Sequence, residues 1–408
     1  MVNTLLRNAR IFDGFNDDIA DGQDLLIEGD IIREISDTPI ASGSAEVIDL
    51  KGAFVMPGLI DAHVHVTDWG ASPAELAHQP ASYTALRAAR NMKQMLLRGF
   101  TTVRDACGAD FGLAAAVEEG LVQSPRLYYV GKALSTTGGH GDFRARGDDS
   151  ASCGCADRGL SVVVDGEAAC RQAARNELRK GAHAVKIMAS GGVASPTDPI
   201  NNLQFSEAEV RAIVEEAAFQ GRYVMAHAYT AEAIRRCLEF GVRSIEHANL
   251  IDRETAEFAT ARGAYVVPTL ITYAAMHERG AEIGLPKHSI AKMHDVREAG
   301  LQSLEYLKAA RTRTGFGTDL FGALQTDQSR ELLIRAEIDS RVDVLRSATS
   351  VNAELLGMAG KIGCIRPGAF ADILIVAGNP VEDLNVLQGQ GERIIYIVKG
   401  GQFIKRPL

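Results

Sequence analysis

The stretch that decides the fold is SEAEVRAIVEEAAFQGRYVMAHAYTAEAIRRCLEFG, residues 206–241. It reads as a helix, a short buried strand and a second helix. The first helical segment opens with Ser206-x-x-Glu209, a capping box, and ends at a glycine. The strand segment, YVMAHAY, is a short apolar run with His227 near its end. Because strands that alternate with helices form parallel sheets, this stretch predicts one unit of an α/β fold.

Seven further apolar runs repeat this strand pattern along the chain. They cover residues 53–66, 100–106, 126–134, 184–190, 244–250, 264–270 and 314–320. Helix-like segments lie between several of them, for example YTALRAARNMKQMLLRG at 83–99. Eight strand–helix units predict a (β/α)₈ barrel, whose active site forms at the carboxyl ends of the strands.

The two ends of the chain have a different pattern. Residues 1–52 and 369–408 contain short alternating runs separated by glycine turns, which is typical of hairpin-rich β structure. We therefore predict a small β-sandwich domain formed by both termini, residues 1–57 and 360–408. The barrel would occupy residues 58–359.

The composition narrows the class of protein. Hydrophobic residues make up 46% and charged residues 23%, as in ordinary soluble proteins. The net charge of −9 argues against a nucleic-acid-binding surface. No apolar run approaches the roughly 20 residues that span a bilayer, and MVNTLLRNARIFDGF lacks the apolar core of a signal peptide. We expect a cytoplasmic protein that binds neither nucleic acid nor membrane.

The six cysteines are scattered, without the two spaced CxxC pairs of a zinc ribbon. We interpret them as reduced thiols. A redox-active or disulfide-bonded pair at Cys153 and Cys155, in CGC, is the alternative.

Polar residues stand at the predicted strand ends. His63 and His65 end the first strand, and residues two apart in a strand point to the same face, so both imidazoles can reach one metal ion. His227 and His247 end the fifth and sixth strands, and Asp319 ends the eighth. A buried core histidine or a helix N-cap could explain each one alone, but five together indicate a metal site. The remaining histidines fall in helical or loop segments and are interpreted as non-ligands: His78, His183, His277, His288 and His294. His140 lies in the long loop after the third strand.

Lys186 lies in the middle of the apolar run AVKIMAS. Burying an ammonium is costly unless it is paired or its pKa falls. An ammonium would also repel a metal ion. If Lys186 reacts with CO₂, it becomes a carbamate whose two oxygens can bridge two cations. A structural ion pair and a Schiff-base lysine are the alternatives, and the surrounding histidines and aspartate argue against both.

These motifs resemble those of the amidohydrolase superfamily. They are PGLIDAHVH (57–65), the strand-four lysine, the histidines after strands five and six, the strand-eight aspartate, and IGCIRPGAFADILIVAGNP (362–380). The resemblance covers essentially the whole chain. KIMASGGVASPTDP, MAHAYT and SIEHANLID are more narrowly similar to the prolidase-like subgroup of Xaa-Pro dipeptidases and zinc carboxypeptidase-type enzymes, which has a binuclear metal site.

The resemblance implies a complete set of ligands for two Zn²⁺ ions. His63, His65 and Asp319 would bind the more buried ion, and His227 and His247 the more exposed one. Lys186, as N6-carboxylysine, and a hydroxide would bridge the two. The subgroup also implies a homo-oligomer, with an octamer as one form.

The implied reaction is hydrolysis of an amide bond in a dipeptide or an N-acyl amino acid, as in an Xaa-Pro dipeptidase or a carboxypeptidase-like enzyme. The bridging hydroxide would attack the carbonyl carbon, and Asp319 would move the proton to the leaving amine. Other hydrolases could use the same site, acting on mycotoxin-type N-acyl aromatic amino acids, cyclic amides or lactones. A non-catalytic scaffold with this fold is the alternative of another class, and it should have lost metal ligands.

Two glycine-rich segments are candidates for substrate recognition. STTGGHGDFRARGDDS (135–150) follows the third strand and offers His140, Arg144 and Arg146. We expect His140 and Tyr229 to bind the substrate carboxylate, with Arg144 as a further candidate. GGVASPTDP (191–199) follows Lys186 and is predicted to contact substrate; an ordinary turn between strand and helix is the alternative.

Overall fold

The computed structural model describes residues 3–70, 76, 78–144, 147, 159–193, 198–281 and 287–407. Arg146, Cys153, Cys155 and the side chains of His288 and His294 lie outside the described part. By its contacts the chain divides into two units, residues 1–61, 93–103 and 332–408, and residues 62–92 and 104–331. The domain boundaries at 57/58 and 359/360 stay a proposal.

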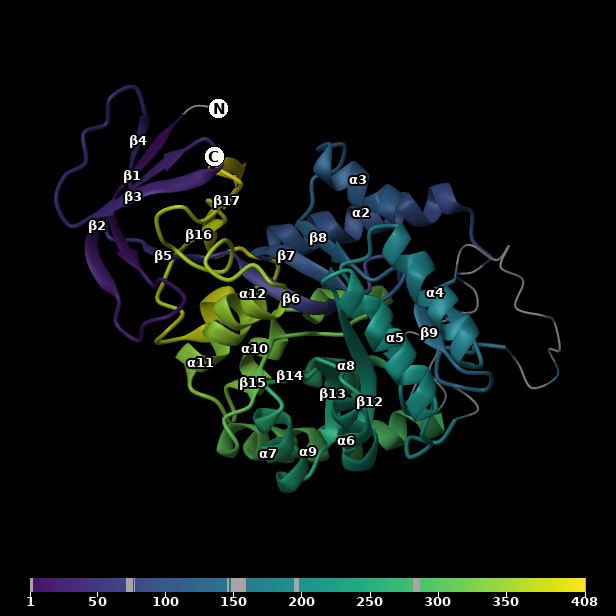
Figure 1. The fold of residues 1–408 in the computed structure, drawn as a ribbon. Coiled ribbons are helices and arrows are strands. Elements are labelled where there is room, and N and C mark those ends of the chain that lie inside the picture. Colours follow the sequence, from purple (N-terminus) through teal and green to yellow (C-terminus); the bar gives the residue numbers. More distant parts are fainter. Residues whose placement is uncertain are drawn as a thin grey trace. The chain divides into compact units, whose positions relative to one another are not determined.

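Strands from both termini build the β-sandwich domain, as predicted (Figure 1). They form an eight-stranded sheet in the order β18-β17-β16-β5-β1-β2-β3, with β4 paired to β1. Antiparallel pairing of β5 with β16 sets Met56 opposite Leu374 and so joins the two ends of the chain. Leu25, Val55 and Ile373 belong to its buried apolar core. The strands are β1 Thr4–Ile11, β2 Ala20–Glu28, β3 Ile31–Ser36, β4 Glu46–Asp49, β5 Phe54–Pro57, β16 Ile373–Val376, β17 Ile394–Lys399 and β18 Gln402–Lys405.

The predicted (β/α)₈ barrel is confirmed. Its strands are β6 Leu59–Val64, β7 Phe100–Asp105, β8 Arg126–Tyr129, β9 Ala133–Ser135, β11 Ala184–Met188, β12 Tyr223–Thr230, β13 Ser244–Leu250, β14 Tyr265–Val267 and β15 Arg313–Thr314. β6, β7 and β8 form one sheet, and β9 and β11–β15 are parallel neighbours in another, with β10 Ser161–Val163 beside β9. The third predicted run, 126–134, contains β8 and the first two residues of β9. The N–H of Ala62 donates to the carbonyl of Phe316, just beyond β15, at 2.9 Å, and so joins the first strand to the last.

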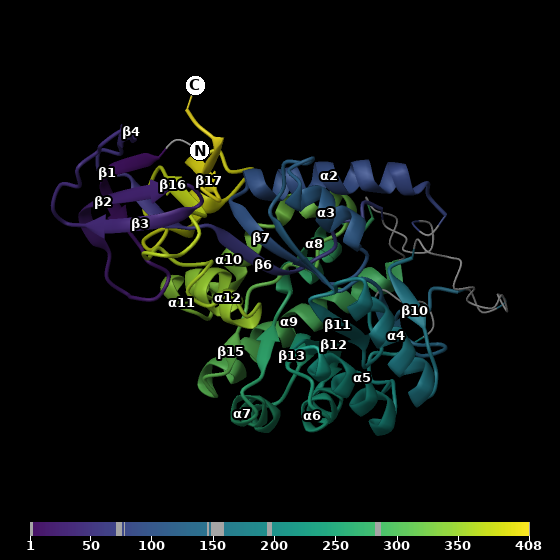
Figure 2. The ribbon, with the colours of Figure 1, turned by 45° about the horizontal axis from the view of Figure 1, so that its top comes forward.

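Helices cover the outside of the barrel strands; α4, α5, α6 and α7 lie outside β11, β12 and β13 (Figure 2). Ser206 and Glu209 form the predicted capping box at the start of α5. The helices are α2 Ala81–Leu97, α3 Phe111–Glu118, α4 Glu167–Arg179, α5 Glu207–Phe219, α6 Ala231–Glu239, α7 Arg253–Ala261, α8 Leu270–Arg279, α9 Lys287–Ala309, η1 Gly322–Asp327, α10 Arg330–Arg335, α11 Arg341–Arg346, η2 Ser347–Val351, α12 Asn352–Leu355 and η3 Leu384–Leu387.

The apolar run 53–66, predicted as one strand, contains two. β5 belongs to the sandwich sheet and β6 to the barrel, with Gly58 between them. A Cβ at Gly58 would lie 2.0 Å from Oγ1 of Thr101, so this crossing of the two segments requires glycine.

Among the described helices, none is long and apolar enough to cross a membrane. Cys107, Cys170, Cys237 and Cys364 are buried free thiols.

Candidate metal centre

Three of the predicted ligands converge at the strand ends. One donor atom from each of His63, His65 and Asp319 lies within 4.8 Å of the others. Oδ1 of Asp319 is 2.9 Å from Nε2 of His65 and 3.4 Å from Nε2 of His63. One carboxylate oxygen that faces two imidazole nitrogens is a donor set suited to a zinc-like cation. The residues present therefore fit a metal ion.

The backbone explains why Asp319 faces the first strand. The N–H groups of Thr318 and Asp319 donate to the carbonyl of His63 at 3.2 and 2.8 Å. A Cβ at Gly317 would lie 2.8 Å from Cβ of His63, so only glycine permits this approach. Asp319 itself has a φ of 53°, a left-handed conformation that is costly for a non-glycine residue and that often marks a functional site.

The other two histidines are close neighbours inside β12 and β13, each three residues before the last residue of its strand rather than at the strand end that the sequence predicts. The ring centroids of His227 and His247 are 4.6 Å apart, and those of His247 and His63 are 5.0 Å apart. Nδ1 of His247 is 2.8 Å from Oγ1 of Thr269, and Nε2 of His227 is 3.3 Å from the carbonyl of Gly191. Burial lowers the pKa of both imidazoles well below its usual value. Both side chains are therefore neutral, the form that binds metals.

Lys186, on β11, has a side chain that is almost completely buried, with 2% of the residue exposed. Within the described part of the chain we find no hydrogen bond or ion pair to its amine. Burial lowers its pKa, although Glu246 and Asp319 act in the opposite direction. This balance favours the neutral amine. The structural ion pair considered as an alternative for Lys186 is thus absent from the described contacts.

Two charged residues that sequence reasoning missed support the centre. Glu246 precedes His247 on β13, and its Oε2 lies 2.7 Å from Nδ1 of His63. Nη2 of Arg104, on β7, donates to both oxygens of Glu246 at 2.9 Å. Burial would raise the pKa of Glu246, but Arg104 and His63 outweigh it and hold the pKa below its usual value. Each charge interrupts an apolar run, which is the signal that could have identified the pair.

The residues predicted to bind substrate lie beside the second histidine pair, except for Arg144. The His140 ring stacks on His227 with centroids 4.2 Å apart, and the Tyr229 ring stacks on His247 at 5.4 Å. The Tyr229 hydroxyl is 2.6 Å from that of Tyr273. Arg144 instead donates to the carboxylate of Asp142, from Nε at 2.7 Å and from Nη2 at 2.6 Å.

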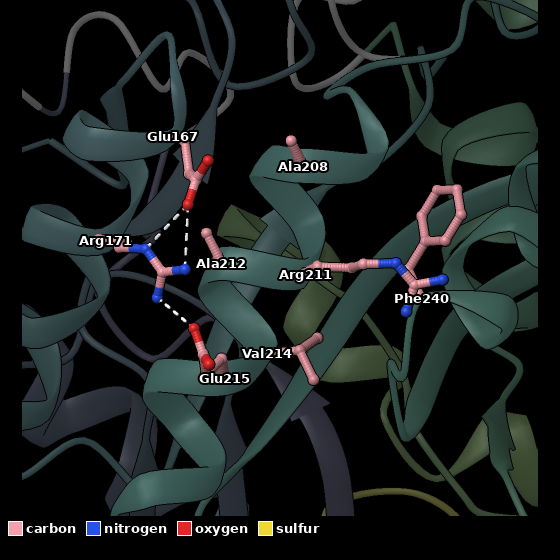
Figure 3. Close-up of a pocket in the computed structure, with 8 residues that line it drawn as sticks. All are labelled: Glu167, Arg171, Ala208, Arg211, Ala212, Val214, Glu215 and Phe240. Carbon is pink, nitrogen blue, oxygen red and sulfur yellow. Dashed lines mark hydrogen bonds and ion pairs between the residues drawn. The ribbon is translucent and has the colours of Figure 1, made fainter.

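A surface hollow lies elsewhere, along α4 and α5 (Figure 3). None of the predicted site residues lines it. Its charged groups have ion-pair partners: Arg171 pairs with Glu167 and Glu215, and Arg211 pairs with Glu207. Arg211 also lies over the ring of Phe240. We interpret this hollow as an outer ion-pair network.

The barrel, the sandwich from both termini and the histidine–aspartate group define a barrel protein with a candidate metal centre. The chain belongs to the amidohydrolase family, whose model matches residues 54–403. It is thus a hydrolase of a family named for amide hydrolysis, and the predicted membership and prolidase-like character are confirmed.

Individual relatives agree with this assignment. The chain is 33% identical over 368 residues to ochratoxinase of Aspergillus niger, covering 86% of this chain and 76% of the relative. A solved prolidase complexed with N-methylphosphonate-L-proline is 47% identical over the full length of both chains, with a TM-score of 0.97. A solved Xaa-Pro dipeptidase with bound methionine is 30% identical, with a TM-score of 0.88, covering 99% of this chain and 100% of that one.

Proposed function

We propose that the chain is a binuclear zinc amidohydrolase that cleaves the amide bond of dipeptides or N-acyl amino acids, with Xaa-Pro dipeptides as the first choice. The observation that carries this proposal is the buried amine of Lys186, which has no hydrogen-bond or ion-pair partner among the described residues and lies on the strand next to that of His227. The similarity to a prolidase complexed with N-methylphosphonate-L-proline supports the choice of substrate.

In this proposal His63, His65 and Asp319 hold one zinc ion, and His227 and His247 hold the other. Lys186 serves both after carboxylation. Its neutral amine nitrogen forms a bond to the carbon of CO₂ and loses a proton, which gives a carbamate with one negative charge. The lowered pKa of Lys186 supports this step, because only the neutral amine reacts.

The bound ions would supply Lewis-acid activation of the amide carbonyl and of the attacking water. Asp319 is suited to proton transfer because its carboxylate lies at the proposed metal centre, with Oδ1 2.9 Å from Nε2 of His65 and 3.4 Å from Nε2 of His63. It accepts the proton of the water and gives it to the amine nitrogen as the C–N bond breaks.

His140 and Tyr229 are the proposed partners of the substrate carboxylate, because their rings already stack on His227 and His247. Arg144 is the weaker candidate, since Asp142 already neutralises its guanidinium.

The test is a screen of Xaa-Pro dipeptides and N-acyl amino acids with zinc-loaded protein expressed in the presence of bicarbonate. We expect two zinc ions per chain and hydrolysis of at least one Xaa-Pro dipeptide. Full zinc occupancy without hydrolysis of any compound would refute the proposal, and absence of bound zinc would favour a non-catalytic scaffold.

A second candidate is cleavage of N-acyl aromatic amino acids, favoured by the 33% identity to ochratoxinase. Comparing N-acetyl-phenylalanine with alanyl-proline in the same assay separates the two. A higher kcat/KM for the aromatic compound would select the second candidate.

A further inference from the structure

The imidazole of His140 is enclosed on both faces. One face stacks on His227, with an angle of 17° between the rings. The other lies against Gly192, where an added Cβ would be 2.2 Å from Cε1 and 2.5 Å from Nδ1 of the ring. Packing on both faces limits the tilt of the imidazole, but it leaves the ring free to shift within its own plane.

Asp198 supplies the contact that would limit this shift. Its Oδ2 lies 3.6 Å from Nδ1 of His140, and its side chain is only 1% exposed. Nδ1 of His140 and Oδ1 of Asp198 are both buried, and neither has a hydrogen-bond partner among the described residues. Buried polar atoms without partners are rare, and each calls for an explanation. A small closing movement would make the Nδ1–Oδ2 hydrogen bond.

Gln204 connects His140 and Asp198 by hydrogen bonds, and its own backbone is hydrogen-bonded to the barrel. Its side-chain oxygen accepts from the backbone N–H of His140 at 3.1 Å, and its side-chain NH₂ donates to Oδ2 of Asp198 at 3.1 Å. Its own N–H donates to the carbonyl of Ala189, just beyond β11. Gln204 therefore ties the loop that carries His140 to the segment that follows Lys186.

We propose that Asp198 and Gln204 are positioning residues that direct the Nε2 edge of His140 toward the substrate. With Nδ1 facing Asp198, only the Nε2 edge of the enclosed ring is left for a ligand. The idea rests on the proposed function, because it takes His140 as a substrate-binding residue. It gives Asp198, in the SPTDP segment, a role through His140 rather than through direct contact with substrate.

The test compares the zinc-loaded enzyme with its Asp198→Ala and Asp198→Asn variants in two measurements. The first is the crystal structure of each. We expect the His140 ring to shift within its plane in Asp198→Ala while zinc content stays at the wild-type level. In Asp198→Asn, which preserves volume and a hydrogen bond, the ring should keep its position. This readout does not require a known substrate.

The second measurement is the kinetics of alanyl-proline hydrolysis. Losing one oriented hydrogen bond to substrate should raise KM about tenfold in Asp198→Ala with kcat little changed, and Asp198→Asn should recover part of the loss. Asp165→Ala is the matched control, because Asp165 holds the same loop through Thr137 without contacting His140. An unmoved ring in Asp198→Ala, or zinc loss in parallel with activity, would overturn the assignment. Inactive wild-type protein would reject the proposed function and leave the structural readout intact.

Discussion

Nδ1 of His63 lies 2.7 Å from Oε2 of Glu246. Nη2 of Arg104 donates to both oxygens of the same carboxylate at 2.9 Å. The contact directs Nε2 of His63 toward Asp319. A carboxylate behind a metal-binding histidine fixes the tautomer and the direction of the ring. Arg104 is needed because the fully buried Glu246 would otherwise carry an uncompensated charge.

Glu246→Gln keeps the side-chain volume but removes the charge. We expect zinc affinity to fall about 10- to 100-fold, because His63 loses its orienting partner. The metal-free protein should also lose about 3–5 kcal/mol of unfolding free energy, because Arg104 stays buried without its counter-charge. Competition with a chromophoric chelator and urea unfolding measure the two effects. Glu207→Gln, at an exposed pair with Arg211, is the control. Wild-type zinc affinity in Glu246→Gln would contradict this account.

Ser206→Ala removes one half of the capping box of α5. The N–H of Glu209 loses its acceptor, so we expect a loss of about 1 kcal/mol in unfolding free energy. The shift of the urea midpoint relative to wild type measures it. Ser206→Thr keeps a hydroxyl acceptor and should retain most of the stability. Equal losses in the two variants would show that packing, not capping, is responsible.

Much of the fold and of the site could be predicted from the sequence, because the burial of the barrel strands leaves a clear pattern in it. Parallel barrel strands are buried on both faces, so they read as apolar runs, and a polar residue at a strand end stands out. His63, His65 and Asp319 are visible in this way although 254 positions separate His65 from Asp319. The capping box at Ser206 is likewise a purely local pattern.

The features that could not be predicted from the sequence depend on contacts between residues far apart in the chain. Arg104 and Glu246 each appear in the sequence as a charge inside an apolar run, but their pairing across 142 positions follows only from the barrel. The division of the run 53–66 was missed because its hydrophobicity is continuous across Gly58. The space that requires glycine there is set by Thr101, from another strand.

Asp319→Asn tests the proton-transfer role. The amide keeps an oxygen that can bind a metal but cannot accept the proton of the attacking water. We expect zinc content near wild type and a fall in kcat of about 10²–10⁴-fold. Elemental analysis and steady-state kinetics on alanyl-proline measure the two. Asp252→Asn is the control, because Asp252 caps α7 and asparagine caps a helix as well as aspartate does. Full activity in Asp319→Asn would exclude the role.

Lys186→Ala tests the origin of the bridging ligand. The variant removes the amine that would take up CO₂, so we expect the two-zinc site to be lost and hydrolysis with it. Added formate or acetate should restore part of both, because a small carboxylate can occupy the space of the carbamate. Zinc analysis and activity assays over a range of acetate concentrations measure this, with Lys93→Ala, an exposed lysine of α2, as the control.

Carboxylation of Lys186 can also be tested directly in the wild-type protein. Protein expressed with ¹³C-bicarbonate should show a carbamate carbon signal in NMR that is absent from Lys186→Ala. Burial favours the neutral amine that forms this bond, and the metal ions would then retain the carbamate. An unmodified Lys186 in a crystal structure of the zinc-loaded enzyme would show that the two metals are held without it.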